Sequence, residues 1–234
     1  MTVLRLRLAS PLQSWGAPSR FTQRATEAAP TKSGILGLLS AAQGRRRSDP
    51  LEDLLDLELA VRVEQQGTLL RDFHTAHGQP LTNRYYWSDA VFTAHIGGRH
   101  EVLEGVAEAV DAPKFPLYFG RRSCVPVGRV VLDIVDETVA ESLQALPWQA
   151  GRSGRHRMRR QPTVRLNVQA DASVYPGAAA TRELADLPMS FDPVHRQYRT
   201  RVVVDTTVEL PTNSPGVVSG GPAHDPMAAL GDAS

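Results

Sequence analysis

Segments with strand and helix periodicity alternate in a definite order along the first 135 residues of this 234-residue chain. Residues 2–9 begin the series, because leucines alternate with arginines at the two-residue period of a half-buried strand. The later segments follow the same two periods: helix over 31–43, strand over 57–64 and 86–96, helix over 101–110 and strand over 129–135. A short helix is also predicted at 50–56. This order predicts an α+β fold.

The same order of elements is the βαββαβ pattern of a ferredoxin-like core, which RNA-recognition modules share. We expect this core to occupy residues 1–147. Residues 68–86 break the pattern and predict a protruding thumb hairpin. Strand periodicity returns beyond the core and predicts a smaller, mostly β lobe over 148–210. The Pro-, Gly- and Ala-rich segment 211–234 is expected to be a disordered tail.

The composition indicates an ordinary globular protein, with 41% hydrophobic and 22% charged residues. No apolar run approaches the length of a membrane span and no signal-peptide pattern is present, so no membrane association is expected. Cys124 is the single cysteine, which excludes an internal disulfide and a cysteine-cluster metal site. We therefore expect a cytoplasmic protein without a metal or cofactor. The net charge of +1 gives no sign of nucleic-acid binding by itself.

Basic residues near the N-terminus offer two candidate anion sites. Arg5 and Arg7 share one face of the first strand, and we expect that face to be open to a phosphate backbone. Lys32 and Ser33 lie in the first turn of the helix that begins near Thr31, where free N–H groups attract anions. The alternative for Thr31 is a simple N-cap beside a solvated lysine.

The connection over 10–30 carries a second set of candidates. Gln13, Ser14 and Trp15 form a turn that we expect to read and stack on a nucleotide. The alternative is that the indole fills the core, as large aromatic rings often do. Arg24 lies in the same long connection and is a further candidate, since long loops in compact domains are often functional.

Cations and aromatic rings are mixed in two later segments, a combination that suits single-stranded RNA. The predicted thumb contributes Arg71, His74, Arg84 and Tyr85. The later Gly-Arg-Arg-Ser turn contributes Arg121, Arg122 and Ser123 as a candidate phosphate clamp. A third basic run, over 152–160, is expected to be a flexible loop with non-specific nucleic-acid affinity.

Three motifs together resemble the CRISPR-associated RAMP superfamily. They are Ser10-Pro11-Leu12-Gln13-Ser14-Trp15-Gly16 with its following helix, Leu70-Arg71-Asp72-Phe73-His74-Thr75, and Pro116-Leu117-Tyr118-Phe119-Gly120-Arg121-Arg122-Ser123-Cys124. The resemblance is to the Cascade subunits that hold the 5′ handle of the guide RNA. It implies a non-catalytic protein whose partners are crRNA and the Cascade backbone and large subunits. It also implies that target DNA is contacted only indirectly, through the complex.

Two other functions remain open from the sequence. Some relatives of the superfamily are metal-independent endoribonucleases, and His74, Tyr85 and Lys32 are groups of the kind that such chemistry needs. A stand-alone RNA-binding protein with the same fold is the second alternative.

Overall fold

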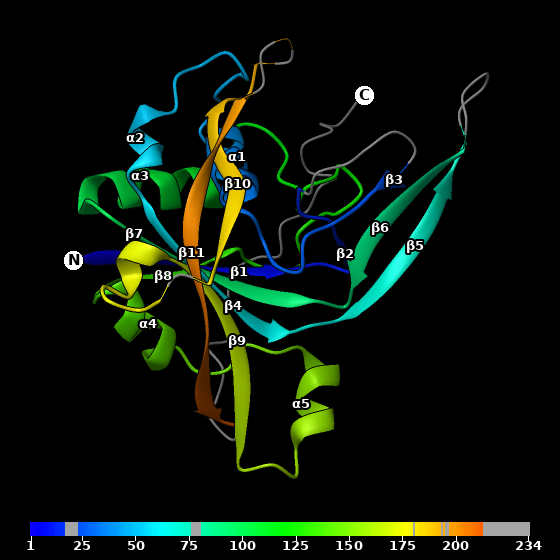
Figure 1. The fold of residues 1–234 in the computed structure, drawn as a ribbon, viewed down its shortest axis with the longest axis vertical. Helices are drawn as coiled ribbons and strands as arrows, with labels where there is room; N and C mark the ends of the chain where they lie inside the picture. Colours follow the sequence, from blue (N-terminus) through cyan, green and yellow to red (C-terminus); the bar gives the residue numbers. More distant parts are fainter. Residues whose placement is uncertain (17–22, 76–80, 180, 193, 195–196, 213–234) are drawn as a thin grey trace, which may run out of the picture.

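The computed structural model describes residues 1–16, 23–75, 81–179, 181–192, 194 and 197–212 (Figure 1). The predicted tail lies almost wholly outside the described residues. The fold is a mixed α/β fold dominated by two sheets. Within the described residues, no helix is long and apolar enough to cross a membrane.

The larger sheet contains seven strands in the order β10-β11-β9-β4-β7-β1-β8. Their bounds are β1 Thr2–Ala9, β4 Glu58–Gln65, β7 Val91–Gly98, β8 Val131–Asp136, β9 Thr163–Asp171, β10 Arg182–Ser190 and β11 Gln197–Pro211. The helices are α1 Lys32–Ala42, α2 Glu52–Leu55, α3 His100–Asp111, α4 Val139–Ala145 and α5 Arg152–Met158, with a 3-10 turn at Ala172–Val174. Every strand pairing in this sheet is antiparallel.

Apolar side chains cover both faces of the larger sheet. On one face, Leu4, Leu6 and Leu8 of β1 join the core formed with α1 and α3. On the other face, Val3 belongs to a second cluster that includes Val139 of α4 and residues of β9 and β11. Figure 1 shows α1 and α3 on one side of the sheet and α4 on the other.

The prediction that the arginines of β1 lie on an open face is wrong, because β1 lies between β7 and β8 and is covered on both sides. The Arg5 side chain is only 10% exposed, and its Nε and Nη2 donate to the two carboxylate oxygens of Asp133 at 2.5 Å. Arg7 is half-buried, and its Nε donates to the Gln149 carbonyl at 3.4 Å.

The strands beyond residue 148 continue the same sheet. β9 pairs with β4 through Ala60↔Ala170 to Arg62↔Val168, and β11 and β10 follow outward. The second apolar cluster contains Ala60 and Val139 as well as Val164 and Val208. Sheet and core therefore cross the boundary predicted near residue 147.

The predicted thumb is a hairpin of two strands, β5 Thr68–His74 and β6 Thr82–Ser88. These strands extend the β4–β7 pair beyond the larger sheet, and Figure 1 shows them projecting as an arm. Gly67 and Asp89 both have positive φ at the junction, at 71° and 56°. A Cβ on Gly67 would lie 2.4 Å from the Ser88 carbonyl oxygen, so the bend needs a glycine there. The strand predicted over 86–96 is divided at this bend.

Two short strands pair with the other edge of β6. β2 (Leu12–Gln13) is antiparallel to it near Trp87, and β3 (Gln23–Arg24) is parallel to it near Arg84. The long N-terminal connection is therefore attached to the base of the hairpin.

Candidate nucleic-acid interface

The N-terminal turn and the Gly-Arg-Arg turn, which are about a hundred residues apart in sequence, lie against each other. The Ser14 amide donates to the Phe119 carbonyl at 3.1 Å. Gly120 has φ +86°, and a Cβ there would lie 1.5 Å from the Ser14 carbonyl oxygen. The contact is therefore one of backbone against backbone, which requires glycine.

The side chains of the N-terminal turn point inward. Gln13 is fully buried and its Nε2 donates to the carbonyls of Leu8 and Ala90 at 3.0 and 2.8 Å. The Ser14 hydroxyl donates to the Tyr85 carbonyl at 3.1 Å. The expectation that Gln13 and Ser14 read a nucleotide conflicts with these partners, because their polar groups are already bonded inside the protein.

The prediction that the Trp15 ring lies free to stack on a base is wrong. The residue is 1% exposed, its ring stacks on Phe119 at a centroid distance of 5.7 Å, and its Nε1 donates to Gln13 Oε1 at 3.2 Å. A Cβ on Gly34 would lie 2.8 Å from this ring, so α1 packs directly on the indole. The core-filling alternative describes this tryptophan.

The predicted anion site at the start of α1 is occupied by the protein's own carboxylates. The Lys32 amide donates to Asp186 Oδ2 at 2.7 Å, and Lys32 Nζ donates to Asp171 Oδ2 at 2.9 Å and to the Leu57 carbonyl. The Lys32 side chain is 7% exposed. Ser33 is half-buried, with its hydroxyl 3.3 Å from Thr31 Oγ1. The Thr31 hydroxyl caps the helix by accepting from the Gly34 amide.

Arg201 completes this buried group and holds both carboxylates. Its Nη1 donates to Asp171 at 2.6 Å, and its Nε donates to Asp186 at 2.7 Å. Burial alone would lower the pKa of Arg201, but the two carboxylates raise that pKa above its usual value. We call Lys32, Asp171, Asp186 and Arg201 the inner ion cluster. It joins α1 to β9, β10 and β11.

Four other predicted residues form a basic surface along β6, with Arg24 and Arg122 exposed and Arg84 and Arg121 half-buried. We call Arg24, Arg84, Arg121 and Arg122 the arginine face. Arg24 and Arg84 are register partners between β3 and β6, so their side chains share one face. The Arg121 guanidinium lies 4.5 Å from the centroid of the Tyr86 ring, and its Nη2 donates to the Arg24 carbonyl at 2.9 Å.

The Arg121 guanidinium still has an unused donor. Its Nη1 is buried and has no hydrogen-bond partner within the part of the chain that the structure describes. A buried donor without a partner is costly, and a phosphate oxygen satisfies it once the groups that cover the atom move aside. Arg122 and Ser123 are exposed beside it. The neighbouring Cys124 is buried, which raises the pKa of its thiol, so it contributes no anion to this surface.

The remaining predicted residues lie along the hairpin. Arg71 is exposed and lies 4.7 Å from the centroid of the Phe73 ring, and His74 Nε2 lies 2.8 Å from Asp72 Oδ2. Tyr85 is half-buried and is the cross-strand partner of Arg71. His74 lies three residues after Arg71 and therefore falls on the opposite face of the hairpin from Arg71 and Tyr85, since side chains alternate along a strand.

The groups considered for endoribonuclease chemistry are not assembled. His74 and Tyr85 lie on opposite faces of the hairpin, and Lys32 Nζ is enclosed in the inner ion cluster. Among the described residues, no group of three His, Cys, Asp or Glu side chains is arranged to hold a metal ion.

Sequence reasoning left Tyr86 out of the candidate site residues and missed the pairing of Arg24 with Arg84. Tyr86 is 3% exposed and supports Arg121 from below. Adjacent cations and aromatics in the hairpin were a visible signal for Tyr86. The two-residue strand β3 has no periodicity that a sequence could display.

The sequence and the fold define the class of this protein when they are compared with known proteins. Residues 3–204 match the model of the CRISPR-associated protein family Cas5, and the chain belongs to that family. It is 36% identical over 147 residues to the "CRISPR system Cascade subunit CasD" of Escherichia coli strain K12. That alignment spans 52% of this chain and 66% of the E. coli protein, just under two thirds of its length.

Two solved structures are similar over nearly the whole chain. One is a chain of a "CRISPR RNA-guided surveillance complex", with a TM-score of 0.73, 33% identity, and coverage of 89% of this chain and 91% of that one. The other is titled "Crystal structure of Cas protein", with a TM-score of 0.69, 34% identity, and coverage of 90% and 95%.

Proposed function

We propose that this chain is a non-catalytic, RNA-binding subunit of a type I-E Cascade surveillance complex, acts in the cytoplasm, and holds the 5′ handle of the crRNA. Membership of the Cas5 family supports this role, as does similarity to a Cascade subunit and to a chain of an RNA-guided surveillance complex. Its partners are then the crRNA and the neighbouring backbone and large subunits.

The strand order supports a ferredoxin-like core within the larger sheet. The four strands β8-β1-β7-β4 are adjacent and antiparallel, α1 connects β1 to β4 (with α2 between them), and α3 connects β7 to β8. These are the connections of a βαββαβ unit. In this protein β9 extends the unit beyond β4.

The observation that carries the RNA-binding proposal is the unused Nη1 donor of Arg121 within the arginine face. Arginine makes forked contacts to phosphate, and its guanidinium stays charged in proteins. Arg84 and Arg24 extend the surface along the hairpin base, and Arg122 extends it outward. His74 lies on the hairpin face that carries Arg84, whose cross-strand partner is Asp72, and the exposed Arg71 and Phe73 lie on the other face of the hairpin.

The geometry favours binding over cleavage. A general base must reach the 2′-hydroxyl while a cation steadies the phosphorane. The separation of His74, Tyr85 and Lys32 supplies no such combination. We therefore infer that cleavage of precursor RNA belongs to another protein.

The arginine face is tested by replacing Arg121 and Arg122 together with Gln and titrating a labelled single-stranded RNA at several salt concentrations. Each lost phosphate contact lowers the slope of log K against log salt by about 0.7 for single strands, so the double variant should lose about 1.4. Arg122→Gln alone is the safer variant, because Arg122 is exposed.

The matched control replaces Arg46 and Arg47, which are exposed beyond the end of α1, with Gln. An unchanged slope in the Arg121/Arg122 variant, or an equal loss in the control, would contradict the role of the arginine face. The subunit role is tested separately by purifying the tagged chain from cells that express its chromosomal neighbours. Several partner proteins and RNAs with one uniform, repeat-derived 5′ end are expected; a lone protein with mixed RNA would contradict it.

A further inference from the structure

The basic run over 152–160, which was expected to be a flexible loop, is a fixed helix followed by a turn. α5 spans Arg152–Met158. Gln65 at the end of β4 holds the helix: its Oε1 accepts from the Gly154 amide at 3.0 Å, and its Nε2 donates to the Ser153 hydroxyl at 3.1 Å. A Cβ on Gly154 would lie 2.3 Å from Gln65 Oε1, so the helix is in close contact with the strand.

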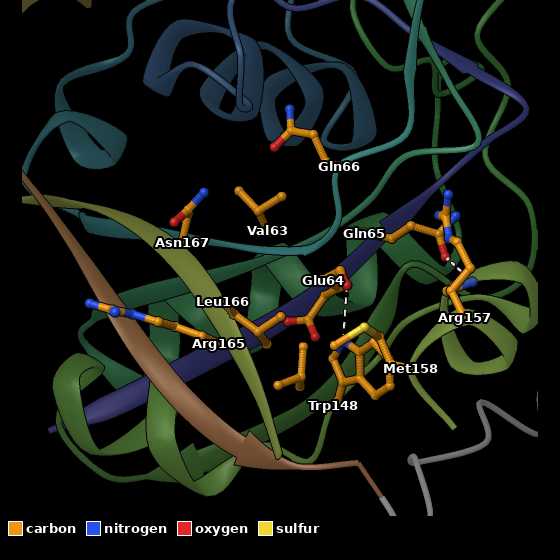
Figure 2. Close-up of a pocket in the computed structure, with 12 residues that line it drawn as sticks. Val63, Glu64, Gln65, Gln66, Trp148, Arg157, Met158, Arg165, Leu166 and Asn167 are labelled. Carbon is orange, nitrogen blue, oxygen red and sulfur yellow. Dashed lines mark hydrogen bonds between the residues drawn. The ribbon is translucent and has the colours of Figure 1, made fainter. Parts of the chain in front are cut away.

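The C-terminal end of α5 is anchored as well. Met158 packs with Trp148, whose Nε1 donates to the Glu64 carbonyl at 2.9 Å. Figure 2 shows Gln65 pointing toward α5 and Met158 lying over Trp148. A pocket of about 310 Å³ separates this part of the helix from β9. The arginines of α5 are therefore displayed from a defined position on the larger sheet.

The surface around α5 carries a strong excess of positive charge. Between Glu141 and Asp171 the sequence has no acidic residue and six arginines. They are Arg152, Arg155, Arg157, Arg159, Arg160 and Arg165, and all six are exposed. None of the six has an ion-pair partner within the described ranges of the chain.

Two exposed acids lie beside this surface, and neither forms an ion pair with one of the six arginines in the described part of the chain. The exposed Asp89 carboxylate accepts from the Ser153 hydroxyl at 2.6 Å, and Glu209 accepts from the Thr163 hydroxyl at 2.5 Å. Arg155 lies near enough to Arg7 that its charge lowers the pKa of Arg7, in addition to the larger lowering by burial and against the attraction of Glu64. Arg155 and the half-buried Arg7 therefore place two positive charges near each other.

The chemistry of this surface differs from that of the hairpin in one respect that identifies its ligand. The segment 149–167 contains no Phe, Tyr or Trp and so offers no ring for an unpaired base to stack on. Binding of single strands combines basic side chains with such rings. Binding of a duplex without sequence preference needs only phosphate contacts and uses arginine readily.

We infer that α5 and the start of β9 form a second nucleic-acid site, which binds the phosphate backbone of duplex DNA without reading its sequence. The site shares no residue with the arginine face, although both lie near the junction of the hairpin with the larger sheet, since α5 contacts Asp89 and Arg121 lies over Tyr86. It gives the chain a direct contact with DNA, in place of the purely indirect contact that the sequence resemblance implied. Duplex affinity of this kind brings DNA to the protein before any base pairing with a guide.

The test uses the full chain and a labelled random-sequence duplex DNA, titrated by fluorescence anisotropy at several salt concentrations. The variant replaces Arg152, Arg157 and Arg160 with Gln. Each lost contact lowers the salt slope by about 0.9, so the slope should fall by roughly 2 to 3, and affinity at low salt should drop at least about tenfold. Because the three side chains are exposed, the melting temperature should not change.

The control replaces three exposed arginines elsewhere, Arg46, Arg47 and Arg199, with Gln. Equal losses in the two triple variants, or unchanged duplex binding in the α5 variant, would overturn the inference. A second titration uses single-stranded RNA. If the α5 variant loses RNA binding and keeps duplex binding, the assignment of the ligand is wrong. The Arg121/Arg122 variant should behave in the reverse way, so failure of this site is distinguishable from failure of the proposed guide-binding function.

Discussion

The inner ion cluster and the arginine face begin from the same kind of sequence signal and end in opposite environments. Lys32 and Arg121 both lie in or just after motifs that carry the family resemblance in the sequence, and both are the basic residue of a turn or helix start. Lys32 is enclosed by Asp171 and Asp186, whereas Arg121 keeps a donor that no described group uses. The difference comes from distant strands: β9 and β10 bring carboxylates to Lys32 and bring none to Arg121.

A basic motif therefore indicates a nucleic-acid site only where the fold brings no carboxylate close enough to pair with its basic side chain. The cluster around Lys32 is electrically balanced, with two cations and two carboxylates in mutual contact. Its contribution is to hold the C-terminal strands against α1. We expect its variants to change stability and variants of the arginine face to change RNA affinity.

The largest effect should come from Asp171→Asn, which keeps the shape of the side chain and removes its charge. Both Lys32 and Arg201 would lose a buried partner, and breaking a buried pair costs about 3–5 kcal/mol. Urea unfolding followed by circular dichroism measures the change in the free energy of unfolding.

Asp205→Asn is the matched control, because its pair with Arg182 is exposed on both sides. An exposed pair contributes about 0–1 kcal/mol. If the two variants lose the same stability, the inner ion cluster does not fasten the C-terminal strands, and the contrast between the two regions fails.

A smaller effect is expected from Gly120→Ala, which tests whether the arginine face depends on the packing beneath it. The substitution combines a positive φ with a collision against the Ser14 carbonyl, which together should cost about 2–4 kcal/mol and displace Arg121. Gly177→Ala is the control, since Gly177 has the same φ of +86° but open space at its Cβ. It should lose only about 1–2 kcal/mol. Equal losses at the two positions would show that the close backbone contact is unimportant.

The sequence predicted the regular elements well where one periodicity continued for several residues. The strand expected over 2–9 is Thr2–Ala9, the helix expected over 31–43 is Lys32–Ala42, and the helix expected over 101–110 is His100–Asp111. β10 was missed, and its burial alternates only in part because Pro188 and two register shifts interrupt the pairing. α5 was missed because its first turns are Gly- and Arg-rich and its anchor, Gln65, is distant in sequence.

The site was predicted less well, and the reason is physical. The sequence motifs identified the two turns that contact each other through Ser14 and Phe119. Whether a side chain in such a turn is buried depends on residues distant in sequence, which only the tertiary structure brings close. Trp15 packs on Phe119 and α1, and Lys32 is bonded to two aspartates from later strands. The RNA roles assigned to Arg24, Arg71, His74, Arg84, Tyr85, Arg121, Arg122 and Ser123 stay predictions.

The smallest effect concerns a second buried polar group, His95, and it is a dependence of stability on pH. His95 is fully buried, with its ring nitrogens next to the hydroxyls of Thr93 and Ser142. Burial above all, and then the charges of Arg62 and Arg5, hold the pKa of this imidazole well below its usual value.

In the unfolded chain the same imidazole takes a proton near pH 6.5, while the folded chain does not. Stability from this group is therefore complete above about pH 6.5 and falls as the pH decreases below it, by at most about 1.4 kcal/mol per pH unit. Urea unfolding at pH 7.5, 6.5 and 5.5 measures that slope. His95→Gln should flatten it, while His100→Gln, at an exposed position on α3, should leave it unchanged. If the slope persists in His95→Gln, other groups cause the loss of stability at low pH. The arginine face contributes no such pH dependence, because its guanidinium groups stay charged throughout this range. A persistent slope would therefore remove this difference between the interior of the molecule and the arginine face.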